Sequence, residues 1–348
     1  MQKTVLLPLL CYAGLGFLAL YMPLLHSGAY IPGRAEELND FFHFHWSYWW
    51  ARHALVTPGL NVYLSDYVLF PYENNLALHT SALFWLPLWA LLEALAGTLN
   101  ALNGIFWVAF SLTGWSMYAL LRREEVGHGL ALVGGLALMT TPLMFYAAWW
   151  NTSNLVGVFW YPVLLLLWDQ VARTRQLGWA LLFGLALWGA ALTDLQYLLF
   201  APWLVVPCGL RTLHRAAGWS ARARLIGLGA LALVIFAALM WFAGPLPYLL
   251  NLDRERSLAW EVENTLGIAL SGWAQVDALP WKRVTVGGWM TGGVLLGLWL
   301  SVLRRARDGR WFWLAVALPP ALLALGQVMA QHEQPGLAIP FMPRCMPL

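Results

Sequence analysis

The chain is built from long apolar runs that alternate with short polar connections. The runs fall at about residues 4–25, 81–97, 101–121, 129–149, 155–171, 177–193, 195–210, 225–249, 286–303 and 311–330. A helix needs roughly 20 residues, with a range of about 17–25, to cross the hydrocarbon core of a bilayer. Most runs fall near this range, so the pattern predicts an all-α polytopic membrane protein with a single membrane domain over residues 1–348.

The composition excludes a soluble domain and a nucleic-acid-binding protein. Hydrophobic residues make up 60% of the chain and charged residues 11%, whereas soluble domains are about 45–50% apolar and about 25% charged. The 23 tryptophans are typical of a protein with many side chains at membrane–water interfaces. The net charge is +3, but the basic residues are scattered over short connections. We therefore expect membrane lipids as partners and no nucleic acid.

The basic residues predict the orientation of the runs, because arginine and lysine concentrate in cytoplasmic loops. They form clusters at Arg122 and Arg123, at Arg173 and Arg175, at Arg211, Arg215, Arg222 and Arg224, and at Arg304, Arg305, Arg307 and Arg310. Two apolar runs separate each cluster from the next, so all of them are expected in the cytoplasm. In the alternative orientation, Glu124 and Glu125 mark an external loop.

A cytoplasmic N-terminus requires that one run does not cross the membrane. Three runs separate Lys3 from Arg122, which would place these two basic residues on opposite sides. The segment 81–97 is short and contains Pro87 and Glu93, so we interpret it as an interfacial or re-entrant helix on the outer face. This leaves about nine transmembrane helices.

The predicted outer face carries most of the polar chain. It holds the loop 26–80, the loop 250–285 and tight turns at Asn151 and Asp194, whereas the predicted cytoplasmic face has only short basic connections. Binding and catalytic residues concentrate on loops that a rigid scaffold positions. A functional site is therefore expected on the outer face.

The loop 26–80 contains a predicted interfacial helix at 36–55. Pro32 and Gly33 precede this segment, and Pro58 and Gly59 follow it. At about 100° per residue, one narrow arc of this helix contains Glu36, Asp40, His43 and Ser47. Much of the remaining surface is aromatic, which suits the lipid boundary.

The polar arc has several interpretations. It could bind a divalent cation or hold a base for proton abstraction. In the plainest alternative, the helix is an ordinary interfacial one whose polar residues are only solvated. A further alternative is a zinc site built from His43, His45, His53 and His79.

The order of these features resembles the membrane glycosyltransferases of the C-type fold, GT-C. This group holds protein mannosyltransferases, oligosaccharyltransferase catalytic subunits and bacterial lipid-phosphate-sugar transferases. The similar segments are the first apolar run, "EELNDFFHFHWSYWWARHAL" with Asp40, "LFPYENNLALHT", and "LTDLQYLLF" around Asp194. The resemblance implies sugar transfer from a polyprenyl-phosphate donor to an unknown acceptor, outside a bacterial plasma membrane.

The resemblance also implies roles for particular residues. Asp40 matches the family's first-loop acid, which acts as a base on the acceptor or helps to hold a divalent cation such as Mg²⁺ or Mn²⁺. Relatives often have a second acid in the next outer turn, where this chain has Asn151 in "WWNTSN"; this puts a two-carboxylate metal site in doubt. Asp194 is the second expected catalytic residue. The residues expected to bind substrate are Glu36, His43, Arg52, Glu73, His79 and Gln196.

Two other classes of function remain open at this point. Ion-coupled transporters and flippases usually carry ionisable residues at mid-membrane, but here Asp169 and Asp194 lie at the ends of runs. The other alternative is a catalytically inactive membrane relative. The proline-rich end "GLAIPFMPRCMPL" follows the last run without a closing element, so we expect a truncated chain.

Overall fold

A computed structural model describes residues 3–25, 40–69 and 71–251. The helices of more than five residues are α1 (Lys3–Ala19), α3 (Phe41–Val56), α4 (Leu86–Ala96), α5 (Thr98–Arg123), α6 (His128–Met139), α7 (Pro142–Trp150), α8 (Trp160–Thr174), α9 (Leu177–Thr193), α10 (Leu195–Arg215) and α11 (Trp219–Phe242). Short helical segments are α2 (Tyr21–Leu25), η1 (Leu83–Trp85), η2 (Gly157–Phe159) and α12 (Leu246–Leu249). Glu36, almost all of the loop 250–285 and the last two predicted spans lie outside the described residues.

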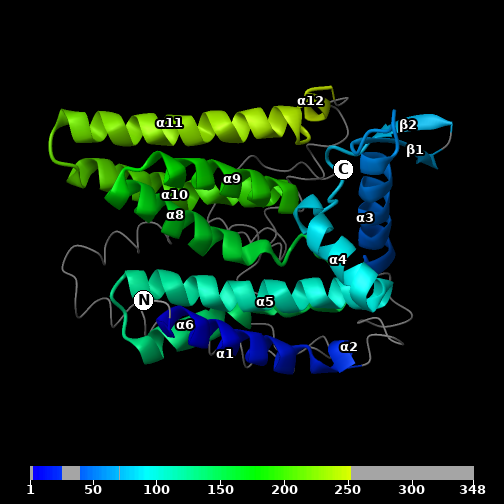
Figure 1. Cartoon of the computed structure of the whole chain (residues 1–348), viewed down its shortest axis with the longest axis horizontal. Coiled ribbons are helices and arrows are strands. Elements are labelled where there is room, and N and C mark those ends of the chain that lie inside the picture. Colours follow the sequence, from blue (N-terminus) through cyan, green and yellow to red (C-terminus); the bar gives the residue numbers. More distant parts are fainter. Residues whose placement is uncertain (1–2, 26–39, 70, 252–348) are drawn as a thin grey trace, which may run out of the picture.

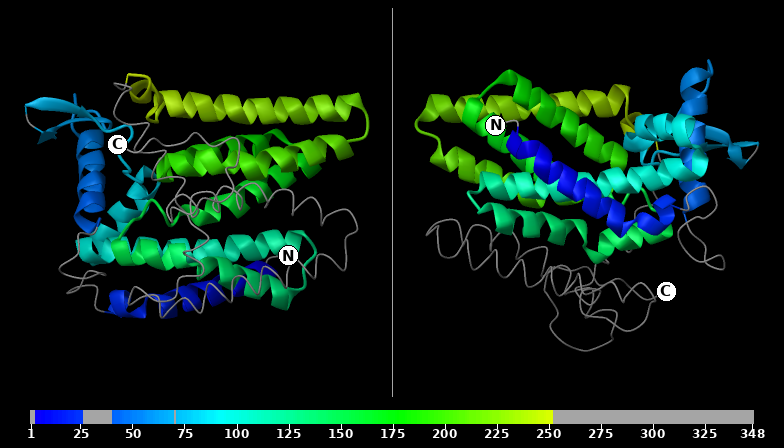
Figure 2. Two further views of the ribbon diagram at one scale, coloured as in Figure 1. Left: turned by 180° about the vertical axis from the view of Figure 1, so that it is seen from behind. Right: turned by 60° about the horizontal axis from the view of Figure 1, so that its bottom comes forward.

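The long helices lie side by side, and α3 lies across one end of them (Figure 1). Two helices organise the packing: α5 contacts α1, α4, α6 and α8, and α9 contacts α8, α10 and α11. Figure 2 shows from behind and from below that α3 keeps its crosswise position in each view. The interfacial helix expected at 36–55 is thus a helix over Phe41–Val56 in the described part of the chain.

Three helices among the described residues are long and apolar enough to cross a membrane. They are α5, the stretch His128–Trp150 that comprises α6 and α7, and α11. Such helices satisfy their backbone polar groups internally, as hydrocarbon requires. The described part of the chain is therefore mostly helical, and its long apolar helices are compatible with an all-α membrane protein.

The packing of α1 against α5 and α6 depends on two glycines. A Cβ atom at Gly114 of α5 would overlap the ring of Tyr12, and one at Gly135 of α6 would overlap the Tyr12 hydroxyl and the carbonyl oxygen of Gly114. Tyr12 is 1% exposed, and its hydroxyl donates to the carbonyl oxygen of Leu132 over 2.9 Å. Small residues let helix backbones approach closely, which is common where apolar helices associate in membranes.

Three of the basic clusters lie at the same end of the bundle. The C-terminus of α5, the α8–α9 connection and the α10–α11 connection all meet at the end opposite to α3 (Figure 1). We call this the arginine end. Asp169 of α8 forms ion pairs there with Arg123 and, over 2.8 Å, with Arg173. The cluster at 304–310 lies outside the described residues.

The opposite end, which we call the pocket end, holds α3, α4 and the polar turns. There the backbone N–H of Asp40, before α3, donates to the carbonyl oxygen of Trp150 at the end of α7 over 2.9 Å. Segment 81–97 forms η1 and α4, whose 11 residues extend about 16 Å, too short for hydrocarbon about 30 Å thick. That 81–97 is an interfacial or re-entrant helix that does not span the membrane remains a prediction.

A two-stranded antiparallel hairpin follows α3, and the sequence did not predict it. Strand β1 (Leu64–Leu69) pairs with β2 (Tyr72–Asn75), with Ser65 opposite Asn74. The rings of Trp49 and Trp50 on α3 contact Tyr67 of β1 at centroid distances of 6.1 and 5.0 Å. The aromatic side of α3 thus packs partly on protein.

Candidate functional site

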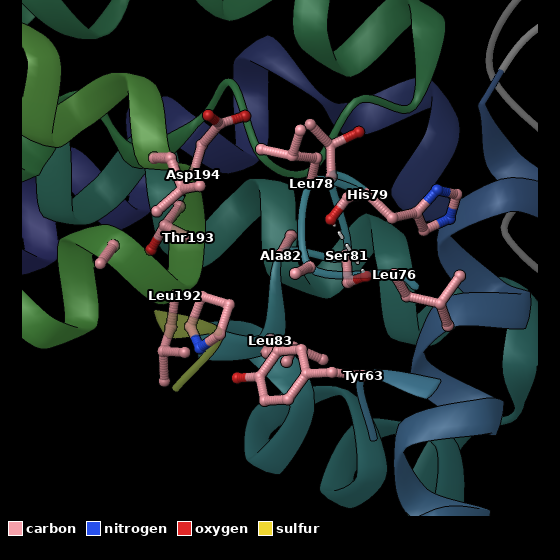
Figure 3. Close-up of a pocket in the computed structure, with 15 residues that line it drawn as sticks. Tyr63, Leu76, Leu78, His79, Ser81, Ala82, Leu83, Leu192, Thr193 and Asp194 are labelled. Atoms are coloured by element: carbon pink, nitrogen blue, oxygen red, sulfur yellow. Dashed lines mark hydrogen bonds between the residues drawn. The ribbon is translucent and has the colours of Figure 1, made fainter. Parts of the chain in front are cut away.

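A pocket lies at the pocket end, between the segment that leads into η1 and the α9–α10 turn (Figure 3). It contains about 470 Å³ of empty space, part of it open to solvent. The lining residues are Tyr63, Leu76, Ala77, Leu78, His79, Thr80, Ser81, Ala82, Leu83, Ala191, Leu192, Thr193, Asp194, Leu195 and Pro245.

Asp194 supplies the carboxyl group of this pocket. It lies between α9 and α10 at the N-cap position of α10, where one carboxyl oxygen accepts from the backbone N–H of Gln196 over 2.8 Å. The other oxygen accepts from the Nδ2 of Asn154 over 2.6 Å. Asp194 is 7% exposed. Burial raises the pKa of Asp194, and its two hydrogen bonds act in the opposite direction.

The turn 151–154 connects α3, η1 and Asp194. Ser153 shares a 2.6 Å hydrogen bond with the hydroxyl of Tyr48 on α3, and its carbonyl oxygen accepts from the indole N–H of Trp85 over 3.0 Å. Asn151 adopts a left-handed backbone with φ of 59°, a conformation that asparagine tolerates. This turn is therefore a buried polar junction, and Asn154 contacts Asp194.

Helix α3 holds the segment that lines the other side of the pocket. The Nε2 of His43 lies 3.2 Å from the carbonyl oxygen of Thr80, and the rings of His43 and His79 lie 4.3 Å apart. The imidazole of His79 points toward α3 and away from Asp194 (Figure 3). Burial lowers the pKa of His79 to about 4, so its ring is neutral near pH 7. His43 and His79 thus position the pocket wall.

Asp40 does not line the pocket, although the sequence predicted it as the acid nearest the reaction centre. It lies at the N-cap position of α3 without a capping hydrogen bond from its side chain. Burial raises the pKa of Asp40, and the nearby His43 acts in the opposite direction. The structure therefore does not bring Asp40 and Asp194 into this one pocket. Catalysis by Asp40 stays a prediction.

Arg52, Glu73 and Gln196, which were also predicted to bind substrate, do not line the pocket. Arg52 forms an ion pair with Glu93 of α4, and its guanidinium lies over the ring of Trp89, 5.1 Å from the centroid. Glu73 is exposed on β2. Gln196 contributes its backbone N–H to Asp194. Glu36 is outside the described residues.

The predicted metal sites do not fit the described residues. No group of three or more histidine, cysteine, aspartate or glutamate side chains comes together in residues 3–25, 40–69 and 71–251. The Nδ1 of His45 accepts from the indole N–H of Trp89 over 3.2 Å, and His53 stacks on Trp49 at a centroid distance of 5.3 Å. A zinc site from the four predicted histidines is therefore wrong. Asp40 lacks the partners with which it could hold Mg²⁺ or Mn²⁺ in this part of the chain.

The far wall of the pocket depends on Tyr248, which the sequence did not single out. Pro245 and Tyr63 line the pocket, and the ring of Tyr63 lies 5.2 Å from that of Tyr248. Asn61 donates to the Tyr248 hydroxyl over 2.5 Å, and Asn75 donates to its carbonyl oxygen over 2.9 Å. These contacts join the hairpin and the residues just before it to α12.

Comparisons with known proteins assign no family to this site. No protein-family model matches the sequence, and no curated protein is significantly similar to it.

Proposed function

We propose that this chain is a multi-pass membrane glycosyltransferase that moves a sugar from a lipid-phosphate donor to a hydroxyl acceptor. The observation that carries the proposal is the buried carboxyl group of Asp194, in a pocket at one end of a bundle of apolar helices. The GT-C-like order of sequence segments supports the same function. In this proposal, nine spans place the pocket end on the extracytoplasmic face, and the N-terminus is cytoplasmic.

The position of the pocket suits a donor that remains anchored in the bilayer. A polyprenyl-phosphate sugar keeps its lipid chain between the apolar helices and presents its anomeric carbon at the membrane surface. Helix α3 lies across the helix ends at that level (Figure 1), and amphipathic or aromatic helices in such positions lie in the interface. The anomeric carbon of the sugar then lies near the pocket, and the lipid chain of the donor remains outside the pocket.

Asp194 is proposed as the general base of the transfer. Its carboxylate takes the proton of the acceptor hydroxyl while that oxygen forms a bond to the anomeric carbon of the sugar. The bond from this carbon to the phosphate oxygen breaks, and the lipid phosphate leaves with the electron pair. Burial shifts the pKa of Asp194 upward, which makes its carboxylate a stronger base near neutral pH.

The direct test is consumption of a lipid-linked donor. The chain is reconstituted in proteoliposomes with a radiolabelled polyprenyl-phosphate sugar and a mixture of hydroxyl acceptors, and loss of label from the donor is measured. Donor loss that requires the protein and an acceptor is the expected result. Absence of donor loss with all common polyprenyl-phosphate hexoses would contradict the proposal.

Orientation of the two ends is testable by cysteine labelling. Asp66 is exposed on the hairpin at the pocket end, and Ala217 is exposed in the α10–α11 connection at the arginine end. In cells, a membrane-impermeant maleimide should modify Asp66→Cys and not Ala217→Cys, because arginine-rich connections stay in the cytoplasm. The opposite labelling pattern would reverse the orientation, and equal labelling would show that the helices do not separate the two ends.

A further inference from the structure

The pocket offers hydrogen-bonding groups for a neutral ligand and no cation for an anion. Among its lining residues, which all belong to the described part of the chain, the side chains include no arginine or lysine. His79 turns its ring toward α3 (Figure 3). The polar side chains that remain are the carboxyl of Asp194 and the hydroxyls of Tyr63, Thr80 and Ser81. The hydroxyl of Thr193 already donates to the carbonyl oxygen of Gly189 and accepts from the indole N–H of Trp160.

The environment of Asp194 disfavours a second negative charge beside it. The described hydrogen-bond partners of its carboxyl group are an amide N–H of Asn154 and the backbone N–H of Gln196, and neither carries a positive charge. Like charges repel more strongly as the local dielectric falls. A ligand hydroxyl, in contrast, donates a hydrogen bond that a buried carboxylate favours.

Arg52, on α3, does not supply the pocket with a positive charge. Arg52 is paired with Glu93, and its guanidinium lies over Trp89 rather than at the pocket lining. A phosphate bound beside Asp194 would therefore lack a cation from the described residues. A phosphate bound elsewhere could recruit cations without meeting this carboxylate.

We propose that the pocket binds the neutral, hydroxyl-bearing acceptor, and that the phosphate of the donor binds outside it. This inference rests on the proposed function and names the class of molecule that the Asp194 pocket receives: an alcohol or a sugar with free hydroxyls. The charge of Asp194 rejects phosphate-bearing molecules from the same space.

The structure allows this charge to be removed with little change of shape. In an Asp194→Asn variant, the amide oxygen can still accept from the backbone N–H of Gln196, and asparagine is as good an N-cap residue as aspartate. The new amide N–H₂ needs an acceptor, and the Oδ1 of Asn154 is buried without a hydrogen-bond partner in the described structure. Rotation of the Asn154 amide by 180° would present this oxygen to the variant side chain.

The test measures occupancy of the pocket rather than turnover. Thr80→Cys is introduced after replacing the three native cysteines with serine, and the protein is placed in nanodiscs of zwitterionic lipid. Labelling of Cys at position 80 by a small maleimide is followed with octyl glucoside or octyl phosphate, at equal concentrations below micelle formation. Asp66→Cys on the exposed strand β1 serves as the control for non-specific effects.

Octyl glucoside should slow labelling at position 80 by about threefold when it is present at about twice its Kd, and octyl phosphate should leave the rate unchanged. Asp194→Asn should weaken protection by the glucoside and create protection by the phosphate. Asp194→Glu, which keeps the charge, should retain the original preference. Each result is compared with the unchanged rate at position 66.

Protection by octyl phosphate in the parent protein, protection by neither compound, or a preference that Asp194→Asn does not alter would overturn the inference. Because the readout is occupancy, it separates this inference from the proposed function. Selective protection by the glucoside in a protein that consumes no lipid-linked donor would leave the pocket a neutral hydroxyl site and reject sugar transfer.

Discussion

An Asp194→Asn variant is expected to lose about 10²–10⁴-fold in the rate of sugar transfer, the usual contribution of a general base. The fold should be retained, because the asparagine preserves the N-cap and the orphan Oδ1 of Asn154 can accept from its amide. Transfer of label from a polyprenyl-phosphate donor in proteoliposomes gives the rate, and size-exclusion chromatography checks the fold. Asp194→Ala should additionally destabilise the protein by about 0.5–2 kcal/mol through loss of the cap.

The rate should also depend on pH in a direction set by Asp194. A base must be deprotonated, and burial raises the pKa of Asp194 above that of an ordinary aspartate. Transfer should therefore fall as the pH is lowered through that raised pKa. A pH–rate profile of the parent protein that is flat down to the usual aspartate range would remove Asp194 from the role of base.

Asp40→Asn is the matched comparison. From the sequence, Asp40 was the expected base, whereas in the structure it is absent from the pocket lining. Both substitutions remove one negative charge at the pocket end. A large loss with Asp194→Asn and a small one with Asp40→Asn would assign the base to the pocket. The opposite result would assign it to Asp40, and would make the pocket carboxyl structural.

A Gly135→Ala substitution should lower the stability of the protein. The added Cβ would overlap the Tyr12 hydroxyl and the carbonyl oxygen of Gly114, and both are held in close helix contacts. Overpacking of this kind costs about 1–3 kcal/mol. The midpoint of thermal unfolding in detergent should be lower than that of the parent protein. The reason is that the added methyl group pushes α1 away from α5 and α6.

Gly129 provides the control in the same helix. A Cβ at this position meets nothing within 4 Å, so Gly129→Ala should leave stability unchanged or raise it by about 0.5–1 kcal/mol. Equal destabilisation by both substitutions would show that the effect comes from helix conformation rather than from contact with Tyr12. The glycine contacts between α1, α5 and α6 would then not be essential.

The helices were predictable from sequence because their signal is local. Each apolar run carries its own length and hydrophobicity, and the arginines mark one set of helix ends without knowledge of the packing. Helix bounds were less accurate: α10 continues to Arg215 although the apolar run was placed at 195–210. The residues after position 210 are mostly polar, so they end the apolar run but not the helix. The turn at Asp194 was also found, because an acidic residue interrupts two apolar runs.

The pocket itself was not predictable, because its geometry depends on contacts between distant residues. A helical arc grouped His43 with Ser47, and in the structure the Ser47 hydroxyl donates to the carbonyl oxygen of His43 over 2.9 Å. The helical arc could not show that Asp40 is the N-cap residue of α3 and does not line the pocket. The Asn154–Asp194 hydrogen bond joins residues 40 positions apart, and neither periodicity nor charge pattern contains that information.

The contacts of Tyr248 have a consequence for the order in which this protein matures. Its amide partners Asn61 and Asn75 lie 187 and 173 residues earlier in the chain. During synthesis, the hairpin leaves the ribosome long before Tyr248, which holds it in place. The residues before Tyr248 therefore fold without the contacts that complete this pocket wall, and the pocket is complete only after α12 has formed. A nascent chain that stops before Tyr248 should contain Asp194 but lack the contacts of Tyr248 with Asn61 and Asn75 that complete the pocket wall.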